Sequence, residues 1–136
     1  MPKVSRESAA HVDDHGPVED RHEDVEGYTI NFVTFRQDID STPLLRGLPG
    51  DSCPCPHWGY VFKGRVTYTF EDREEVHEAG DAFYVPAGHL QRADAGTEYL
   101  QFSPADELRT VSETIMKNMQ QMRAVVTPNP PASQRG

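Results

Sequence analysis

The feature that most constrains the fold of this chain is a succession of short β-type segments separated by turn residues. The clearest segment spans residues 65–70, where Val66, Tyr68 and Phe70 alternate with two threonines, as in a strand that buries one face. Other segments rich in β-branched and aromatic residues lie between turns that contain Gly, Pro or Asp; they cover residues 28–35, 58–62, 75–78, 82–85 and 98–102. Many short strands at close spacing predict an all-β sandwich or barrel.

The pattern changes its period after residue 102. Ser103 is placed as a helix cap, Pro104 as the first helical residue and Asp106 as the acid three residues after the cap. Apolar residues then recur at helical spacing and form one stripe, which consists of Leu108, Val111, Ile115, Met119 and Met122. The sequence therefore predicts a helix over residues 104–124 that packs on the sheet or on a partner subunit.

Both ends of the chain are predicted to lie outside the β-domain. Residues 1–26 contain eight Asp or Glu against three Lys or Arg and few apolar residues, which indicates a flexible acidic arm. Residues 125–136 contain three prolines and are predicted to form a disordered tail. The expected organisation is an arm, a β-domain over residues 27–103, a helix and a tail.

The net charge of −9 limits the partners of this chain. A length of 136 residues fits one domain. An acidic surface is repelled by nucleic acid and by anionic membranes, so neither is expected as a partner. No apolar run approaches the length of a membrane span and no signal peptide opens the sequence, so a cytoplasmic protein is the expectation.

Both cysteines and the only tryptophan lie within residues 51–64. Cys53, Cys55 and His57 occupy alternate positions, and alternate residues of an extended strand project to one face. Two cysteines separated by one proline are poor disulfide partners, so the row is interpreted as three soft metal ligands. The alternative is that the cysteines are small packing residues and that the histidine is a hydrogen-bonded core residue.

Two blocks of the sequence resemble the two motifs of the cupin superfamily of small jelly-roll barrels. The first is residues 57–64, His-Trp-Gly-Tyr-Val-Phe-Lys-Gly, and the second is residues 80–89, Gly-Asp-Ala-Phe-Tyr-Val-Pro-Ala-Gly-His. The resemblance implies an all-β, cupin-type jelly-roll β-barrel with a C-terminal α-helix. Typical members hold a divalent ion with three histidines and a glutamate. Here His57 stands at the usual place of the glutamate, and Gln91 stands at that of the second-motif histidine.

The resemblance also brings the second motif opposite the first inside the barrel. The implied metal ligands are Cys53, Cys55, His57 and His89. Sulfur and imidazole fit zinc best, with ferrous iron as the second choice. Four protein ligands would close a tetrahedral zinc site, whereas three would leave a position for water or substrate. Tyr60 and Gln91 are the candidates to orient a ligand in the pocket.

The function expected from these residues is that of a small metal-binding cupin that binds or transforms a small organic molecule. If it is an enzyme, the resemblance implies an isomerase, lyase, cyclase or dioxygenase type. The alternatives are a ligand sensor without catalysis and a cupin with a purely structural metal. A homodimer is also expected, because a barrel with an exposed edge and a methionine-rich helix offers surfaces for pairing.

Overall fold

A computed structural model describes residues 3–126 of the chain, and the structural statements below concern those residues. The strands are β1 (His11–Asp14), β2 (Val18–Val25), β3 (Tyr28–Phe35), β4 (Ile39–Asp40), β5 (His57–Lys63), β6 (Arg65–Thr69), β7 (Glu74–Glu78), β8 (Ala82–Val85), β9 (Leu90–Ala93) and β10 (Glu98–Pro104). Two 3₁₀ turns, Thr42–Leu44 and Pro49–Asp51, separate β4 from β5. One helix, α1 (Ala105–Val126), follows β10.

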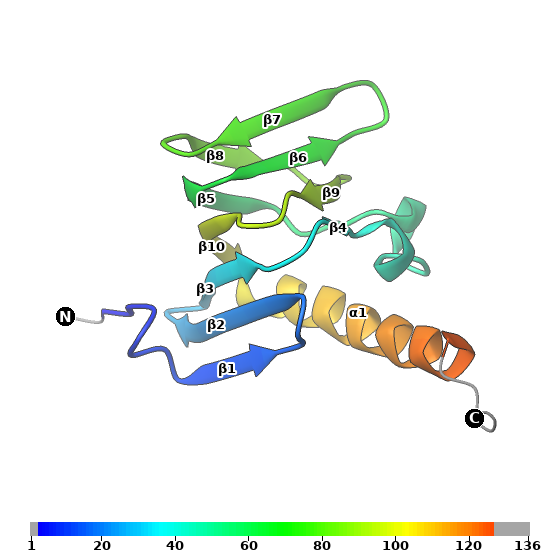
Figure 1. Cartoon of the computed structure of the whole chain (residues 1–136), viewed down its shortest axis with the longest axis horizontal. Coiled ribbons are helices and arrows are strands. Elements are labelled where there is room, and N and C mark those ends of the chain that lie inside the picture. The colour runs from blue at the N-terminus through cyan, green and yellow to red at the C-terminus, as the bar shows by residue number, and fades with distance from the viewer. Residues whose placement is uncertain (1–2, 127–136) are drawn as a thin grey trace.

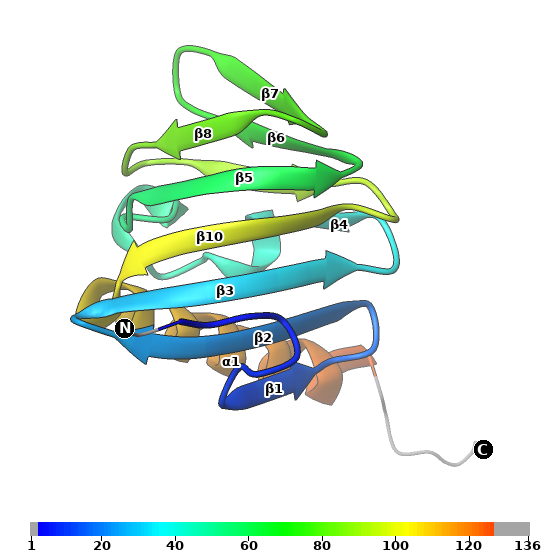
Figure 2. The ribbon, with the colours of Figure 1, turned by 90° about the vertical axis from the view of Figure 1, so that its left-hand side faces the viewer.

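The strands form two antiparallel sheets. The larger sheet has the strand order β1-β2-β3-β10-β5-β8, and Figure 2 shows these strands lying one below another. The smaller sheet has the order β4-β9-β6-β7. Strands that are distant in sequence are paired, such as β3 with β10, and the chain crosses between the sheets from β5 to β6 and from β8 to β9. This arrangement with a single C-terminal helix confirms the predicted jelly-roll class.

The prediction of a flexible acidic arm needs correction for residues 11–25. In the structure β2 pairs with β3 along its whole length, and β1 pairs with β2 at the edge of the larger sheet. Composition does not register this, because the pairing is made by backbone groups that β3 would otherwise leave unpaired. The acidic side chains are offset locally: Arg36 contacts Asp14 at 2.8 Å, and Asn31 donates to Asp20 at 3.0 Å.

The apolar core lies between the two sheets. Its buried members come from both sheets and are Val33, Phe35, Val61, Val66, Tyr68, Phe83, Val85, Ala93 and Tyr99. Val66 and Tyr68 are completely buried, which confirms the alternation predicted for residues 65–70. A second cluster lies under α1 and contains Leu45, Leu48, Cys53, Cys55 and Val111. The first cluster joins the two sheets, and the second joins α1 to the segment between β4 and β5.

The helix begins one residue later than predicted. Pro104 is the last residue of β10, and α1 starts at Ala105. Val111 is buried in the second cluster, with Leu108 and Ile115 packed against it, so the predicted apolar stripe faces the chain's own interior. Residues 127–136 of the predicted tail lie outside the part of the chain that the structure describes. Within residues 3–126, no helix combines the length and apolar character that a membrane crossing needs.

Candidate metal centre and pocket

Three of the four candidate ligands lie together in the interior. One ligand atom each from Cys53, His57 and His89 falls within 4.8 Å of the others, and all three residues are buried. The Sγ atom of Cys53 lies 3.7 Å from Nε2 of His57. The backbone sets the group: Cys53 and His89 form a β-bridge, in which the amide of Cys53 donates to the carbonyl of His89 at 2.9 Å. His57 is the first residue of β5.

Hydrogen bonds at the far side of each ring orient both histidines. Nδ1 of His89 donates to the carbonyl of Pro86 at 2.8 Å, since a carbonyl only accepts, and this leaves Nε2 as a free electron pair. Nδ1 of His57 lies 2.7 Å from the hydroxyl of Ser103. Partners of this kind fix ring orientation in metal sites and raise the basicity of the ligand atom. Nε2 of His89 is therefore available to an ion, and Nε2 of His57 is available in the tautomer whose Nδ1 donates to Ser103.

Burial keeps the three groups neutral when no ion is bound. Desolvation, followed by the proximity of His89, lowers the pKa of His57 to about 3. Desolvation also lowers the pKa of His89. Burial raises the pKa of the Cys53 thiol to about 11. Two neutral imidazoles are ready ligands, whereas the thiol must lose its proton to bind, so metal binding would release a proton.

Cys55, the fourth candidate, does not belong to the cluster of close ligand atoms. Its side chain is fully buried in the second cluster, and its thiol donates to the Pro56 carbonyl at 3.5 Å. Burial raises the pKa of this thiol to about 12, against a smaller opposing effect of a hydrogen bond with Ser103. The predicted row fails as a regular strand because Pro54 and Pro56 lack the amide hydrogens of a ladder: Cys53 forms only an isolated bridge with His89, and the continuous strand starts at His57.

The three ligands line a pocket of about 520 Å³ between the inner face of the larger sheet and α1. The apolar part of its wall comes from the helix and from the strands and loop opposite it: Val18, Val33, Phe35, Ile39, Leu44, Leu45, Leu108, Val111, Ile115, Met116, Met119 and Met122. The polar part includes Asp13, His15, Asp20, Asn31, Ser41, Tyr68, Gln91, Tyr99 and Gln101. The candidate ion would therefore border a space large enough for a small organic molecule.

Of the two predicted pocket residues, the structure places Gln91 in the pocket wall and Tyr60 outside it. Gln91 lines the pocket, and its Nε2 donates to the hydroxyl of Tyr99 at 2.8 Å. Tyr60 does not line it; its ring is 40 % exposed on the outer face of the larger sheet. The reason is strand parity, since His57 of the same strand points inward and a residue three positions later must point outward.

Sequence reasoning missed several polar residues of the pocket. Ser103, expected to cap the helix, instead lies on the inner face of β10 and orients His57. The composition of residues 1–26 predicts that Asp20 lies in a flexible arm, and the pattern of residues 28–35 predicts only that Asn31 lies in a strand. Ser103, Gln101 and Tyr99 alternate along the chain, so their shared parity was the available signal.

Comparison with known proteins identifies the fold. No family model and no curated protein matches the sequence. Among solved structures, an RmlC-like cupin from Shewanella frigidimarina superposes with a TM-score of 0.53 at 16% identity, over 74% of this chain and 88% of that one. The polyketide cyclase RemF from Streptomyces resistomycificus gives a TM-score of 0.53 at 14% identity, over 76% and 79% of the two chains.

A protein of unknown function from Rhizobium leguminosarum has a TM-score of 0.52 at 15% identity and matches 76% of this chain and 94% of that one. Identities this low establish architecture and leave the chemistry to the residues of this chain. The shared architecture agrees with the two sheets described above. This chain has the fold of the cupins.

Proposed function

We propose that the protein binds one divalent metal ion, zinc in the first place, through Cys53, His57 and His89, and that it holds a small organic molecule in the adjoining pocket. The observation that carries this proposal is the location of three buried, convergent ligand atoms on the wall of a 520 Å³ pocket. Core packing would not require two imidazole Nε2 atoms and a thiol to converge.

The donor set favours zinc over the other common divalent ions. One sulfur and two imidazole nitrogens are ligands typical of zinc, with ferrous iron second, whereas magnesium and calcium prefer oxygen. Three protein ligands leave one tetrahedral position open, which is typical of catalytic sites. This set favours a metal that meets a ligand over the structural-metal alternative, in which four protein ligands close the site.

An ion bound there would supply Lewis acidity to a polar group of the pocket ligand. The residues of the chain would do the rest: the apolar wall excludes water, and Gln91 with the Tyr99 hydroxyl fixes a polar group of the ligand. RemF, of the same fold, is described as a polyketide cyclase. A cyclase, isomerase or lyase is therefore the enzymatic form of this proposal. A dioxygenase is less favoured, because its iron site usually contains a carboxylate ligand. A sensor that binds without turnover is the alternative.

Metal analysis of purified protein tests the proposal. The expected result is one zinc per chain, exchangeable with a chelator, and its loss in Cys53→Ser and His57→Ala. His11→Ala is the matched control, because this exposed histidine lies on β1 and is not among the three clustered ligands. Protein that takes up no metal, or loses it equally in the control, would refute the metal centre.

We also propose that the chain forms a homodimer through the outer face of the larger sheet. Large aromatic side chains, each 38–50% exposed, cover this face; they are Tyr28, Trp58, Tyr60, Phe62, Tyr84 and Phe102. Their rings contact one another across strands, as Trp58 does with Tyr84 at 5.1 Å between centroids. Extended aromatic patches are typical of protein interfaces. Of the apolar stripe of α1, which was predicted to pack on the sheet or on a partner, Leu108, Val111 and Ile115 pack in the second cluster, whereas Met122 is 41% exposed.

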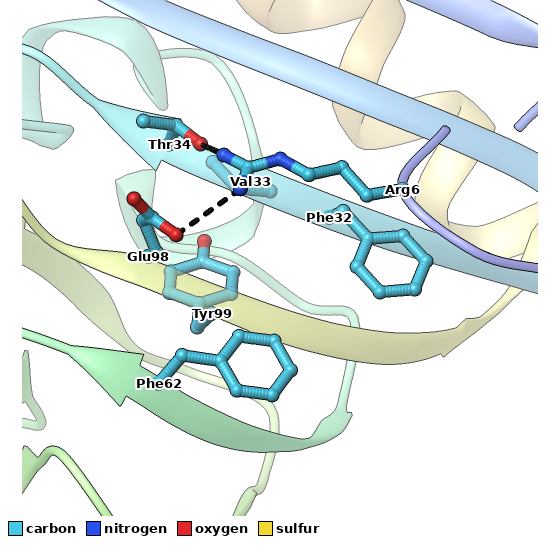
Figure 3. A pocket seen from close by; sticks show the side chains of 7 residues that line it. All are labelled: Arg6, Phe32, Val33, Thr34, Phe62, Glu98 and Tyr99. Carbon is cyan, nitrogen blue, oxygen red and sulfur yellow. Dashed lines mark hydrogen bonds and ion pairs between the residues drawn. The ribbon is translucent and has the colours of Figure 1, made fainter. Parts of the chain in front are cut away.

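The rim of this face favours a second copy as the occupant. Figure 3 shows Arg6 lying across one end, where it pairs with Glu98 at 3.2 Å beside Phe32 and Phe62. Lys63 also approaches Glu98, at 3.6 Å. The rim thus presents both charge signs together, so two identical faces can meet in a twofold arrangement without like charges being forced into contact.

Sedimentation equilibrium tests the dimer. Wild-type protein is expected to be a dimer that Trp58→Ala weakens by tenfold or more, because central aromatic residues dominate interface energy. Val76→Ala is the control, since Val76 is 51% exposed on β7 of the smaller sheet. A wild-type monomer at high concentration, or equal weakening in both variants, would refute this interface.

A further inference from the structure

The pocket has a second polar end, at the far side from the candidate metal ligands. Asp13, His15, Asp20 and Asn31 line the pocket and come from β1, β2, β3 and the turn between the first two. In the larger sheet β2 is separated from β5, which holds His57, by β3 and β10. Three strand spacings amount to roughly 14 Å along the sheet. A ligand that spans the pocket would therefore meet two different polar environments.

The far end is acidic, and the basic groups beside it are histidines: His15 lines it, and Nε2 of His22 lies 2.9 Å from a carboxylate oxygen of Asp13. Two aspartates line it, and no Lys or Arg is found among the described residues that line the pocket. The nearby arginines are engaged on the surface: Arg36 pairs with Asp14 and Glu19, and Arg92 pairs with Glu74. A carboxylate or phosphate placed at this end would meet the like charge of Asp20, whose side chain is hydrogen-bonded, among the described residues, only to the neutral amide of Asn31.

One acceptor at this end lacks a donor in the described part of the chain, and a second receives its hydrogen bonds from a single amide group. Asp20 receives both of its side-chain hydrogen bonds from Nδ2 of Asn31, at 3.0 and 3.2 Å, and within residues 3–126 it forms no ion pair. Asn31 is 4% exposed, and its Oδ1 atom has no hydrogen-bond partner in the described part of the chain. Burial raises the pKa of Asp20, against smaller opposing effects of the Asn31 hydrogen bond and of the nearby His22 and His15. Buried acceptors of this kind are costly unless a donor reaches them.

The space between the two ends is apolar. The helix contributes Leu108, Val111, Ile115 and Met119 to this wall, and Val18 and Phe35 face them from the sheet. Methionine side chains adapt to irregular apolar shapes, so this wall suits a hydrocarbon or aryl body rather than a sugar. The chemistry along the pocket is thus a Lewis-acid site, an apolar middle and a pair of acceptors.

We propose that the pocket ligand is a small organic amine, whose ammonium group lies against Asp20 and Asn31 and whose apolar body runs along α1 toward the metal site. An ammonium has three N–H donors and one positive charge, which match a carboxylate and a spare amide oxygen. The direction of the ligand toward the metal rests on the proposed function, whereas the amine end rests only on the residues of this pole.

The experiment uses three probes with the same body and different ends: 3-phenylpropylamine, 3-phenylpropanol and 3-phenylpropanoate. Their binding to the full chain is measured by calorimetry and by chemical-shift perturbation, with zinc-loaded protein and with protein treated with a chelator. In metal-free protein the amine is expected to bind at least tenfold more tightly than the alcohol, and the acid is expected not to bind. The acid can bind the zinc-loaded form through the metal, which is why the metal-free arm decides.

Variants locate the amine. Asp20→Asn keeps the size of the side chain and is expected to weaken the amine about tenfold or more while leaving the alcohol unchanged. Asp94→Asn is the control, because Asp94 pairs with Arg65 on the surface and does not line the pocket. Equal affinity for amine and acid in metal-free protein, no binding of the amine, or an unchanged amine affinity in Asp20→Asn would overturn the proposal. If Asp20→Asn does not fold, the comparison of the three probes on the wild-type chain decides alone.

The two proposals fail separately. Amine binding in a protein that takes up no zinc would leave the acidic end standing and refute the metal centre. Zinc binding without any preference for the amine would refute the acidic end and leave the metal centre standing.

Discussion

Near the pocket, the larger sheet has polar side chains on its inner face and aromatic side chains on its outer face, which is the reverse of the usual distribution. On β5 the inward residue His57 is buried and polar, and its neighbour Trp58 is apolar and 43% exposed. On β10 the inward residue Gln101 is buried, and its neighbour Phe102 is 38% exposed. Antiparallel sheets commonly place apolar side chains inward and polar side chains toward water. Near the pocket, this sheet does the reverse.

The folding of one chain explains neither the buried polar residues of the inner face nor the exposed aromatic residues of the outer face. Burying polar groups costs stability unless they are hydrogen-bonded, and exposing aromatic rings forgoes the gain from burial. Other inward residues of the same sheet are apolar, such as Val61 and Val85, which are buried in the core. We attribute the inversion to two binding surfaces, an ion and ligand inside and a second copy outside.

The largest effect is expected from the adjacent pair His57 and Trp58. His57→Ala is expected to lower zinc affinity by more than about 100-fold, since a lost ligand should cost more than a lost outer partner. Trp58→Ala should leave zinc affinity within a factor of three. Competition titration with a chromophoric zinc chelator measures both. Equal losses in the two variants would mean that the faces are not functionally distinct.

Ser103 and Phe102 are the corresponding inner and outer neighbours on β10, where Ser103 contacts the ligand His57 rather than the ion. Ser103→Ala removes the hydroxyl that orients His57 at 2.7 Å and is expected to weaken zinc binding by about 10–100-fold. Phe102→Ala should change only the dimer. The same titration applies, with thermal melts to check folding. A fully retained zinc affinity in Ser103→Ala would show that the serine has no positioning role.

The buried imidazole of His57 predicts how metal-free protein responds to acid. Its folded pKa of about 3 lies below the unfolded value near 6.5, so the unfolded chain takes up this proton first. The free energy of unfolding should therefore fall as pH drops from about 6.5 toward 3, by up to about 1.4 kcal/mol per pH unit from this group. Urea unfolding in a chelator, compared with His57→Gln, measures this contribution. Parallel pH profiles for the two proteins would contradict it.

The smallest effect is expected from Cys55. Because its thiol lies outside the ligand cluster, Cys55→Ser should change zinc affinity less than about threefold, whereas Cys53→Ser should lose most of it. The buried serine hydroxyl should cost about 1–3 kcal/mol of unfolding free energy. Similar metal losses in the two variants would mean that both sulfurs bind and that the site is closed.

Local pattern was sufficient to predict six of the strands, the helix and two residues of the cluster, Cys53 and His57, because period-two and period-3.6 patterns depend on neighbours in sequence. His89 entered the predicted set through the resemblance to the second cupin motif. The alternation of Val66 and Tyr68 and the stripe through Val111 are of this kind. Other features depend on pairing across the sheet. Asp20 belongs by composition to the acidic arm. Composition cannot show that the backbone of β2 forms hydrogen bonds with the backbone of β3.

Two predicted site residues, Cys55 and Tyr60, lie away from the ligand cluster and the pocket, for reasons that can be found in the sequence. Cys55 shares the parity of His57, but the prolines on either side prevent a regular strand, so parity does not fix its direction. Tyr60 has the opposite parity, and the alternation that suggested the ligand row already placed it outside. Ser103 fitted a helix cap equally well, and only the position of His57 across β10 and β5 gives it another role.

X-ray absorption spectroscopy of the zinc-loaded protein tests whether Cys53, His57 and His89 form an open metal centre. We expect the zinc to be surrounded by one sulfur at about 2.3 Å and two imidazole nitrogens at about 2.0–2.1 Å, together with an exchangeable oxygen. The single sulfur signal should vanish in Cys53→Ser and persist in Cys55→Ser. A shell with two sulfurs, or with none, would contradict the open centre formed by Cys53, His57 and His89.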